Sequence, residues 1–78
     1  MEKLTEQLYY YQGMNPDDED KYILYNKIQK VNIGKIEKIR VGRFMHWCLV
    51  PNSDTYFSNG CLKAISKFIT KLFVKKNG

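Results

Sequence analysis

Four lysines recur at every fourth residue near the C-terminus of this 78-residue chain, in the segment NGCLKAISKFITKLFVKK. They are Lys63, Lys67, Lys71 and Lys75. On a helix such residues lie in a row with steps of about 6 Å, so the row spans roughly 18 Å. Repulsion costs about 0.2–0.5 kcal/mol per neighbouring pair, and no acidic residue follows Asp54 to offset it. The row is typical either of a solvated helix face or of a surface that binds phosphates or acidic side chains.

A second group of cations precedes the row in the sequence. It consists of Lys38, Arg40 and Arg43, with Lys35 beside them. If both groups face the same way, they form one phosphate-binding surface on which Tyr56, Phe57 or Tyr22 could stack bases. Lysine is a point charge and arginine the better reader of bases, so we expect a lysine-rich surface to bind nucleic acid largely without sequence specificity.

Residues that could support catalysis or bind a metal are few. The sequence has one histidine, His46, and two cysteines, Cys48 and Cys61, and it lacks phosphate-binding glycine loops and nucleophile motifs. His46 and Cys48 would share one face of a strand, but a structural zinc site needs four ligands and a Cys-His nucleophile needs a third, orienting group. We therefore expect no enzymatic activity, no metal and no cofactor, with Cys48 and Cys61 as reduced thiols or, alternatively, a disulfide.

The charge is divided unevenly along the chain. Residues 1–20 carry one lysine against six carboxylates, a net charge of −5, and residues 21–78 carry twelve basic residues against two carboxylates, a net charge of +10. A basic body attracts polyanions or an acidic protein surface. The longest apolar run, FMHWCLV, is too short to cross a bilayer. A chain of this length forms one domain, here 1–78, and we expect a cytoplasmic protein that does not bind membranes.

The first part of the chain predicts two helices. In residues 2–12, Leu4, Leu8 and Tyr11 have helical spacing before Gly13, although three consecutive tyrosines also favour a strand. In residues 15–34, Asn15, Pro16 and the acidic run Asp17 to Asp20 have the pattern of a helix start. Leu24, Ile28 and Val31 would form its buried stripe, and Asn32 with Gly34 would end it.

The second part predicts strands and a final helix. Ile39, Val41, Met45, Trp47 and Leu49 alternate as one strand face, with Gly42 as a hairpin turn or a bulge. Residues 51–54 predict a turn and residues 55–57 a short third strand. Ser58 or Asn59 would cap a helix that buries Leu62, Ile65, Phe68, Ile69, Leu72 and Phe73, with the lysines on its far side. The predicted fold class is α+β: two N-terminal helices, a short antiparallel β-meander and a C-terminal amphipathic helix packed on the sheet.

In size, composition and the segment GRFMHWCLVPNSDTYFSNGCLKAISKFITKLF, the chain resembles small early or accessory proteins of phages or mobile elements from low-GC Gram-positive bacteria. That resemblance implies an inhibitor that blocks a host protein. The residues alone favour a non-enzymatic protein that binds nucleic-acid backbone. Their proposed contacts are Lys63, Lys67, Lys71, Lys75, Lys38, Arg40 and Arg43. A third alternative is a homodimer formed through YYYQ or an edge of the meander.

Overall fold

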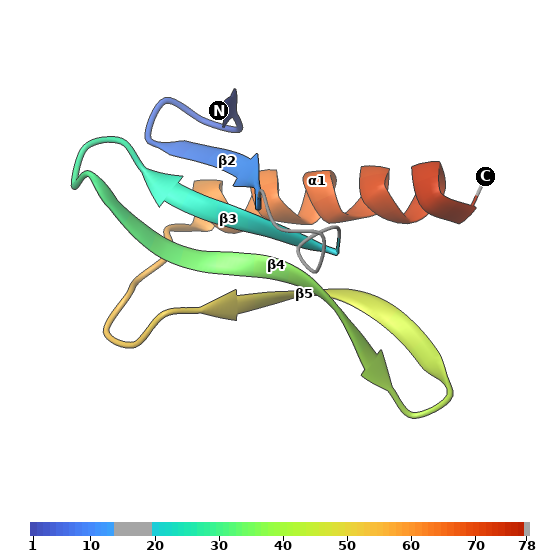
Figure 1. Ribbon diagram of the computed structural model, residues 1–78. Helices are drawn as coiled ribbons and strands as arrows, with labels where there is room; N and C mark the ends of the chain where they lie inside the picture. The colour runs from blue at the N-terminus through green and yellow to red at the C-terminus, as the bar shows by residue number, and fades with distance from the viewer. Residues whose placement is uncertain (14–19, 78) are drawn as a thin grey trace.

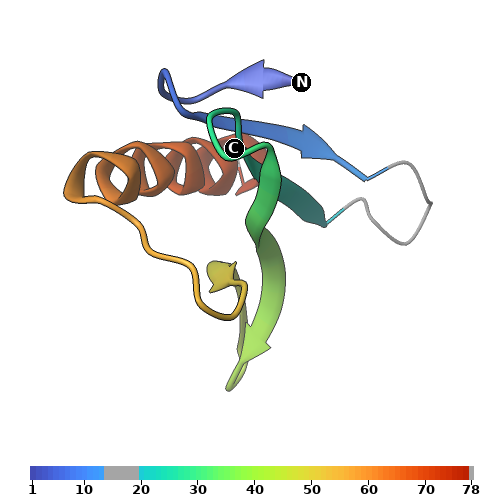
Figure 2. The same cartoon turned by 90° about the vertical axis from the view of Figure 1, so that its left-hand side faces the viewer.

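The described residues form a five-stranded antiparallel sheet with one helix packed on it. The computed structural model describes residues 1–13 and 20–77, and for 74–77 the backbone alone. Its elements are β1 (Glu2–Lys3), β2 (Leu8–Gln12), β3 (Lys21–Asn26), β4 (Val31–Val41), β5 (Phe44–Pro51) and α1 (Asn59–Asn77). The strands lie in the sheet in chain order, each beside the next, and α1 runs along one face (Figures 1 and 2). The α+β class, the meander and the packed C-terminal helix are thus confirmed.

The predicted helix over residues 2–12 is wrong, and the competing strand prediction is correct for its second half. Leu8–Gln12 forms β2, which pairs with β1 on one side and with β3 on the other. Tyr9 pairs directly with Tyr25, and such aromatic cross-strand pairs stabilise a sheet. The helical spacing of Leu4 and Leu8 arises because both pack on the core from either side of a turn. In that turn the Leu4 amide donates to the Leu8 carbonyl.

The second predicted helix is also wrong where the structure describes it. Lys21–Asn26 is β3, and Asn26 then begins a turn: its side-chain oxygen accepts hydrogen bonds from the amides of Ile28 and Gln29, both at 2.9 Å. Lys30 closes this turn with a φ of 59°. Leu24 is buried as expected, but Ile28 lies in the turn, 67% exposed. The proposed helix start at Asn15 to Asp20 falls mostly outside the described residues.

The β4–β5 hairpin turns at Gly42 and Arg43. Of the two predictions for Gly42, a hairpin turn or a bulge, the hairpin turn is therefore correct. Gly42 has a φ of 64°, which glycine adopts without strain, and Val41 pairs with Phe44 across the turn. Because Arg40 pairs with Met45, odd-numbered residues of β4 share a face with even-numbered residues of β5. The single face predicted for Ile39, Val41, Met45, Trp47 and Leu49 is therefore wrong. Ile39 and Val41 lie on the face opposite to that of the other three.

The core lies between the sheet and α1. Its buried side chains are Leu8, Leu24, Ile33, Ile36, Trp47, Ile65 and Leu72. A bulge in β4, where the register with β3 shifts, places Ile33 and Gly34 in the buried part of that strand. Trp47 is 8% exposed and serves as the core residue that its flanking apolar side chains predicted. The opposite face of the sheet carries no helix among the described residues.

The start of α1 is capped as predicted by Ser58, whose side-chain oxygen accepts a hydrogen bond of 3.2 Å from the Cys61 amide. The predicted strand at 55–57 is absent, and those residues form an irregular connection to the helix. Ile65 and Leu72 are buried, and Phe68 and Ile69 pack against the core. Leu62 and Phe73, expected in the core, are 45% and 55% exposed because the sheet covers a narrower arc of the helix than the apolar residues occupy. Within the described chain, no helix is both long and apolar enough to cross a membrane.

Gly34 is a position where the fold admits no side chain. A Cβ atom there would lie 2.9 Å from the Val50 carbonyl oxygen and 3.1 Å from the Pro51 Cα, both backbone atoms of β5. Gly34→Ala is therefore expected to lower the free energy of unfolding by about 1–3 kcal/mol, measured by urea denaturation. The matched control is Gly60→Ala, at which a Cβ meets only the Ser58 side chain at 3.9 Å. An unchanged midpoint for Gly34→Ala would contradict this packing.

Candidate anion-binding groove

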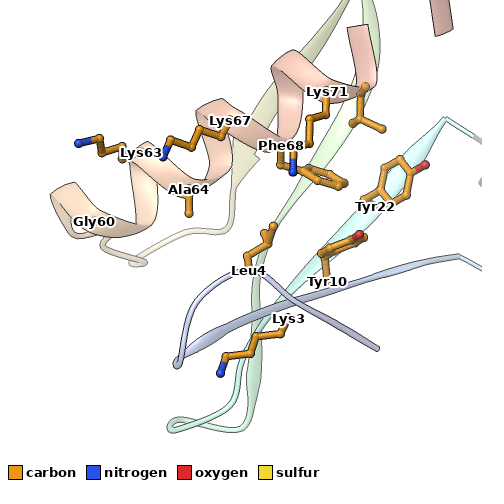
Figure 3. Close-up of a pocket in the computed structure, with 11 residues that line it drawn as sticks. Lys3, Leu4, Tyr10, Tyr22, Gly60, Lys63, Ala64, Lys67, Phe68 and Lys71 are labelled. Carbon is orange, nitrogen blue, oxygen red and sulfur yellow. The ribbon is translucent and has the colours of Figure 1, made fainter. Parts of the chain in front are cut away.

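Three of the four lysines in the predicted row line one wall of a groove. Lys63, Lys67 and Lys71 line it from α1. In Figure 3 the Lys71 side chain reaches toward Phe68, whereas the Lys63 side chain extends away from Tyr10 and Tyr22. The cavity between them and the sheet has a volume of about 590 Å³, within the range of pockets that hold small ligands. We call it the lysine groove (Figure 3). The side chain of Lys75, the fourth member of the row, lies outside the described residues.

The groove exists because small residues follow the same flank of the helix. Gly60 and Ala64 are four residues apart and both line the cavity, so they lie one above the other on α1. Larger side chains there would fill the space between α1 and the N-terminal strands. The helix can therefore pack its core face on the sheet and still leave a recess beside the lysines.

Aromatic rings form the floor of the groove. Tyr10 from β2, Tyr22 from β3 and Phe68 from α1 all line it. The Tyr10 and Phe68 ring centroids are 4.4 Å apart, and Tyr22 meets both rings edge-on, at 5.8 Å from Tyr10 and 5.3 Å from Phe68. Such contacts hold the rings in fixed orientations. Burial raises the pKa of the Tyr10 hydroxyl above its ordinary value.

The groove is electropositive on its helical wall. Among the described residues, ion pairs join Lys3 to Glu6, Lys21 to Glu37 and Lys35 to Glu37, and no carboxylate pairs with Lys63, Lys67 or Lys71. On the opposite rim, the Lys3 ammonium lies 2.6 Å from Glu6. That hydrogen bond and the Glu6 charge raise the pKa of Lys3. The three helical lysines thus offer unneutralised charge to an anion, whereas Lys3 is already paired.

The strand cations lie elsewhere. Lys38 pairs with Trp47 across β4 and β5, and the exposed Arg40 donates from Nε to the Gly42 carbonyl at 3.3 Å. Arg43 is in the turn that follows. In the sheet order, this hairpin is at the edge opposite to β1, and Figures 1 and 2 show its tip well away from α1. Arg40 and Arg43 therefore form a basic group separate from the lysine groove. Lys38 shares the sheet face of Trp47, which α1 covers, but it is not among the residues that line the groove.

The possible metal ligands are also separated. His46 and Cys48 share one face of β5, as predicted. That face points away from α1, and Cys61 is a residue of α1, so the three side chains do not converge. Both cysteines are free thiols. No cluster of three or more metal-binding side chains occurs in the described part of the chain.

Several groove residues were not among those proposed from the sequence. Lys3 and Tyr10 come from a segment predicted as a helix, and no local pattern links them to residue 63. Tyr22, also in a segment predicted as a helix, was named as a residue that could stack bases, and it does line the groove. The recess itself had a signal that could have been used: Gly60 and Ala64 have the same four-residue spacing as the lysines. Phe68 was assigned to the core, which it does contact while also lining the groove.

Comparison with known proteins gives no relative: no protein-family model, no curated protein and no solved structure matches this chain. A function for the groove has to be inferred from its own residues.

Proposed function

We propose that this is a non-enzymatic protein that binds the phosphate backbone of nucleic acid through Lys63, Lys67 and Lys71. The observation that carries the proposal is the absence of any carboxylate partner for these three ammonium groups among the described residues, although they line a single wall. Phosphates would supply the missing negative charge. Lys75 continues the row in the sequence.

The row suits a repeating anion better than a single one. Lysines four residues apart on a helix are about 6 Å apart along its axis, so the row offers contacts at regular intervals along a polymer. Lysine contacts phosphate as a point charge and does not fix a base edge in two hydrogen bonds. Binding is accordingly expected to depend weakly on base sequence.

Salt dependence tests the proposal. Each phosphate contact to a single strand contributes about 0.7 to the slope of log affinity against log salt, so three contacts give a slope near −2. Raising salt from about 50 to about 200 mM should then weaken binding of a fluorescent oligonucleotide about 20-fold, measured by anisotropy. An affinity that does not change with salt, or no binding of single or double strands at the lower salt, would overturn the proposal.

A further inference from the structure

We infer that the lysine groove receives a single strand of nucleic acid, with phosphates along the helical wall and a base against the aromatic floor. This inference rests on the proposed function and names its substrate class. The observation that supports it is that the helical wall of the groove carries positive charge and the floor carries aromatic rings. In the described part of the chain, the charged residues on the helical wall are all lysines, and the floor includes the rings of Tyr10, Tyr22 and Phe68.

The distribution of charge distinguishes a single strand from a duplex. A duplex presents phosphates on its outside and keeps its bases stacked inside, so it is best met by an outward-facing ridge of cations. Here the lysines border a recess whose inner surface is aromatic (Figure 3). A single strand presents phosphates on one side and unstacked bases on the other, which matches both surfaces at once.

The recess also has suitable dimensions and rigidity. Its volume of about 590 Å³ is that of a pocket for a small ligand, too confined for a double helix. The ring contacts among Tyr10, Tyr22 and Phe68 continue to Trp47 in the core, 5.7 Å from Tyr22 between ring centroids. The floor is therefore anchored before any ligand binds, so little ordering of side chains is needed on binding.

The test compares three probes at the same low salt: a dT oligonucleotide, a U oligonucleotide of equal length and a duplex of that length. Both single strands should bind at least about tenfold more tightly than the duplex, because only they can stack a base on the floor. A dT strand carrying one 2-aminopurine should lose fluorescence on binding, since stacking quenches this base. Equal or tighter duplex binding with a steep salt slope would overturn the inference and leave the proposed function standing.

Two variants test the recess without removing a lysine. Ala64→Leu places a larger, branched side chain inside the groove. Because leucine is a good helix former, α1 should be preserved. The variant should bind a single strand about tenfold or more weakly. If the lysines bind phosphate as an external ridge, this variant binds normally and the inference fails.

Tyr10→Leu removes a ring from the floor and should weaken binding about tenfold and reduce 2-aminopurine quenching. Its matched control is Tyr9→Leu, the preceding residue of β2, whose side chain lies on the opposite face of the sheet. Thermal melts establish that both variants fold. Equal effects of the two substitutions on affinity would contradict the placement of a base on Tyr10, and failure of every probe to bind would refute both proposals.

Discussion

The double variant Lys67→Glu/Lys71→Glu is expected to bind single-stranded nucleic acid about 100-fold more weakly than the unaltered protein at about 50 mM salt. Each lost phosphate contact removes nearly tenfold at that salt, and each new carboxylate also repels the strand. The slope of log affinity against log salt should become shallower by about 1.4. Anisotropy titrations at several salt concentrations measure both quantities.

Controls with the same change in net charge show whether position or total charge matters. Lys27→Glu/Lys30→Glu alters two exposed residues in the turn between β3 and β4, outside the groove. Arg40→Glu/Arg43→Glu alters the separate basic group at the β4–β5 hairpin. Both are expected to shift affinity by only a few-fold, through long-range electrostatics. A loss equal to that of the groove variant would show that binding follows net charge and not the lysine groove.

Truncation of Leu24 to alanine is expected to lower the free energy of unfolding by about 2–5 kcal/mol. Leu24 is fully buried between the sheet and the helix, so its removal leaves a cavity. A domain of this length has a total stability of about 4–12 kcal/mol, and the variant should therefore lose a large part of it. Urea denaturation followed by circular dichroism gives the midpoint and the slope.

Ile28→Ala is the informative comparison for Leu24→Ala. The helical reading placed both residues in one buried stripe, whereas the structure buries Leu24 and leaves Ile28 exposed in a turn. The alanine variant of Ile28 is expected to change stability by less than about 0.5 kcal/mol. Similar large losses for both variants would favour the helix over strand β3.

In the C-terminal half, the hairpin turn and the final helix could be predicted because their signals are local. Ser58 caps the helix through its own side chain, and Gly42 alone provides the positive φ of the hairpin turn. The N-terminal half could not. In β3, apolar and aromatic side chains point to both faces, so the two-residue period that indicates a strand is obscured. The regular helical spacing of Leu24, Ile28 and Val31 favoured a helix, but hydrogen bonding to β2 and β4 makes Lys21–Asn26 a strand.

The candidate site was predictable only in part, for the same reason. The lysine row is a property of one helix and was visible in the sequence, but it was placed opposite the core and away from other elements. Tyr10 and Tyr22 reach it only through the arrangement of the strands. The lysines were therefore predicted as charges on an open surface, and the fold makes them one wall of a groove.

The strand order of the sheet also bears on how quickly the molecule assembles. Every strand pairs with the one preceding it in the chain, so no pairing requires distant segments to find each other first. Proteins built from such near-neighbour contacts close short loops and fold faster than sheets with crossed connections. The lysine groove is an exception, because it forms between α1 and the first strands, which are far apart in the sequence. We expect the groove to be completed in the last step of folding, when α1 docks on a sheet that has already formed.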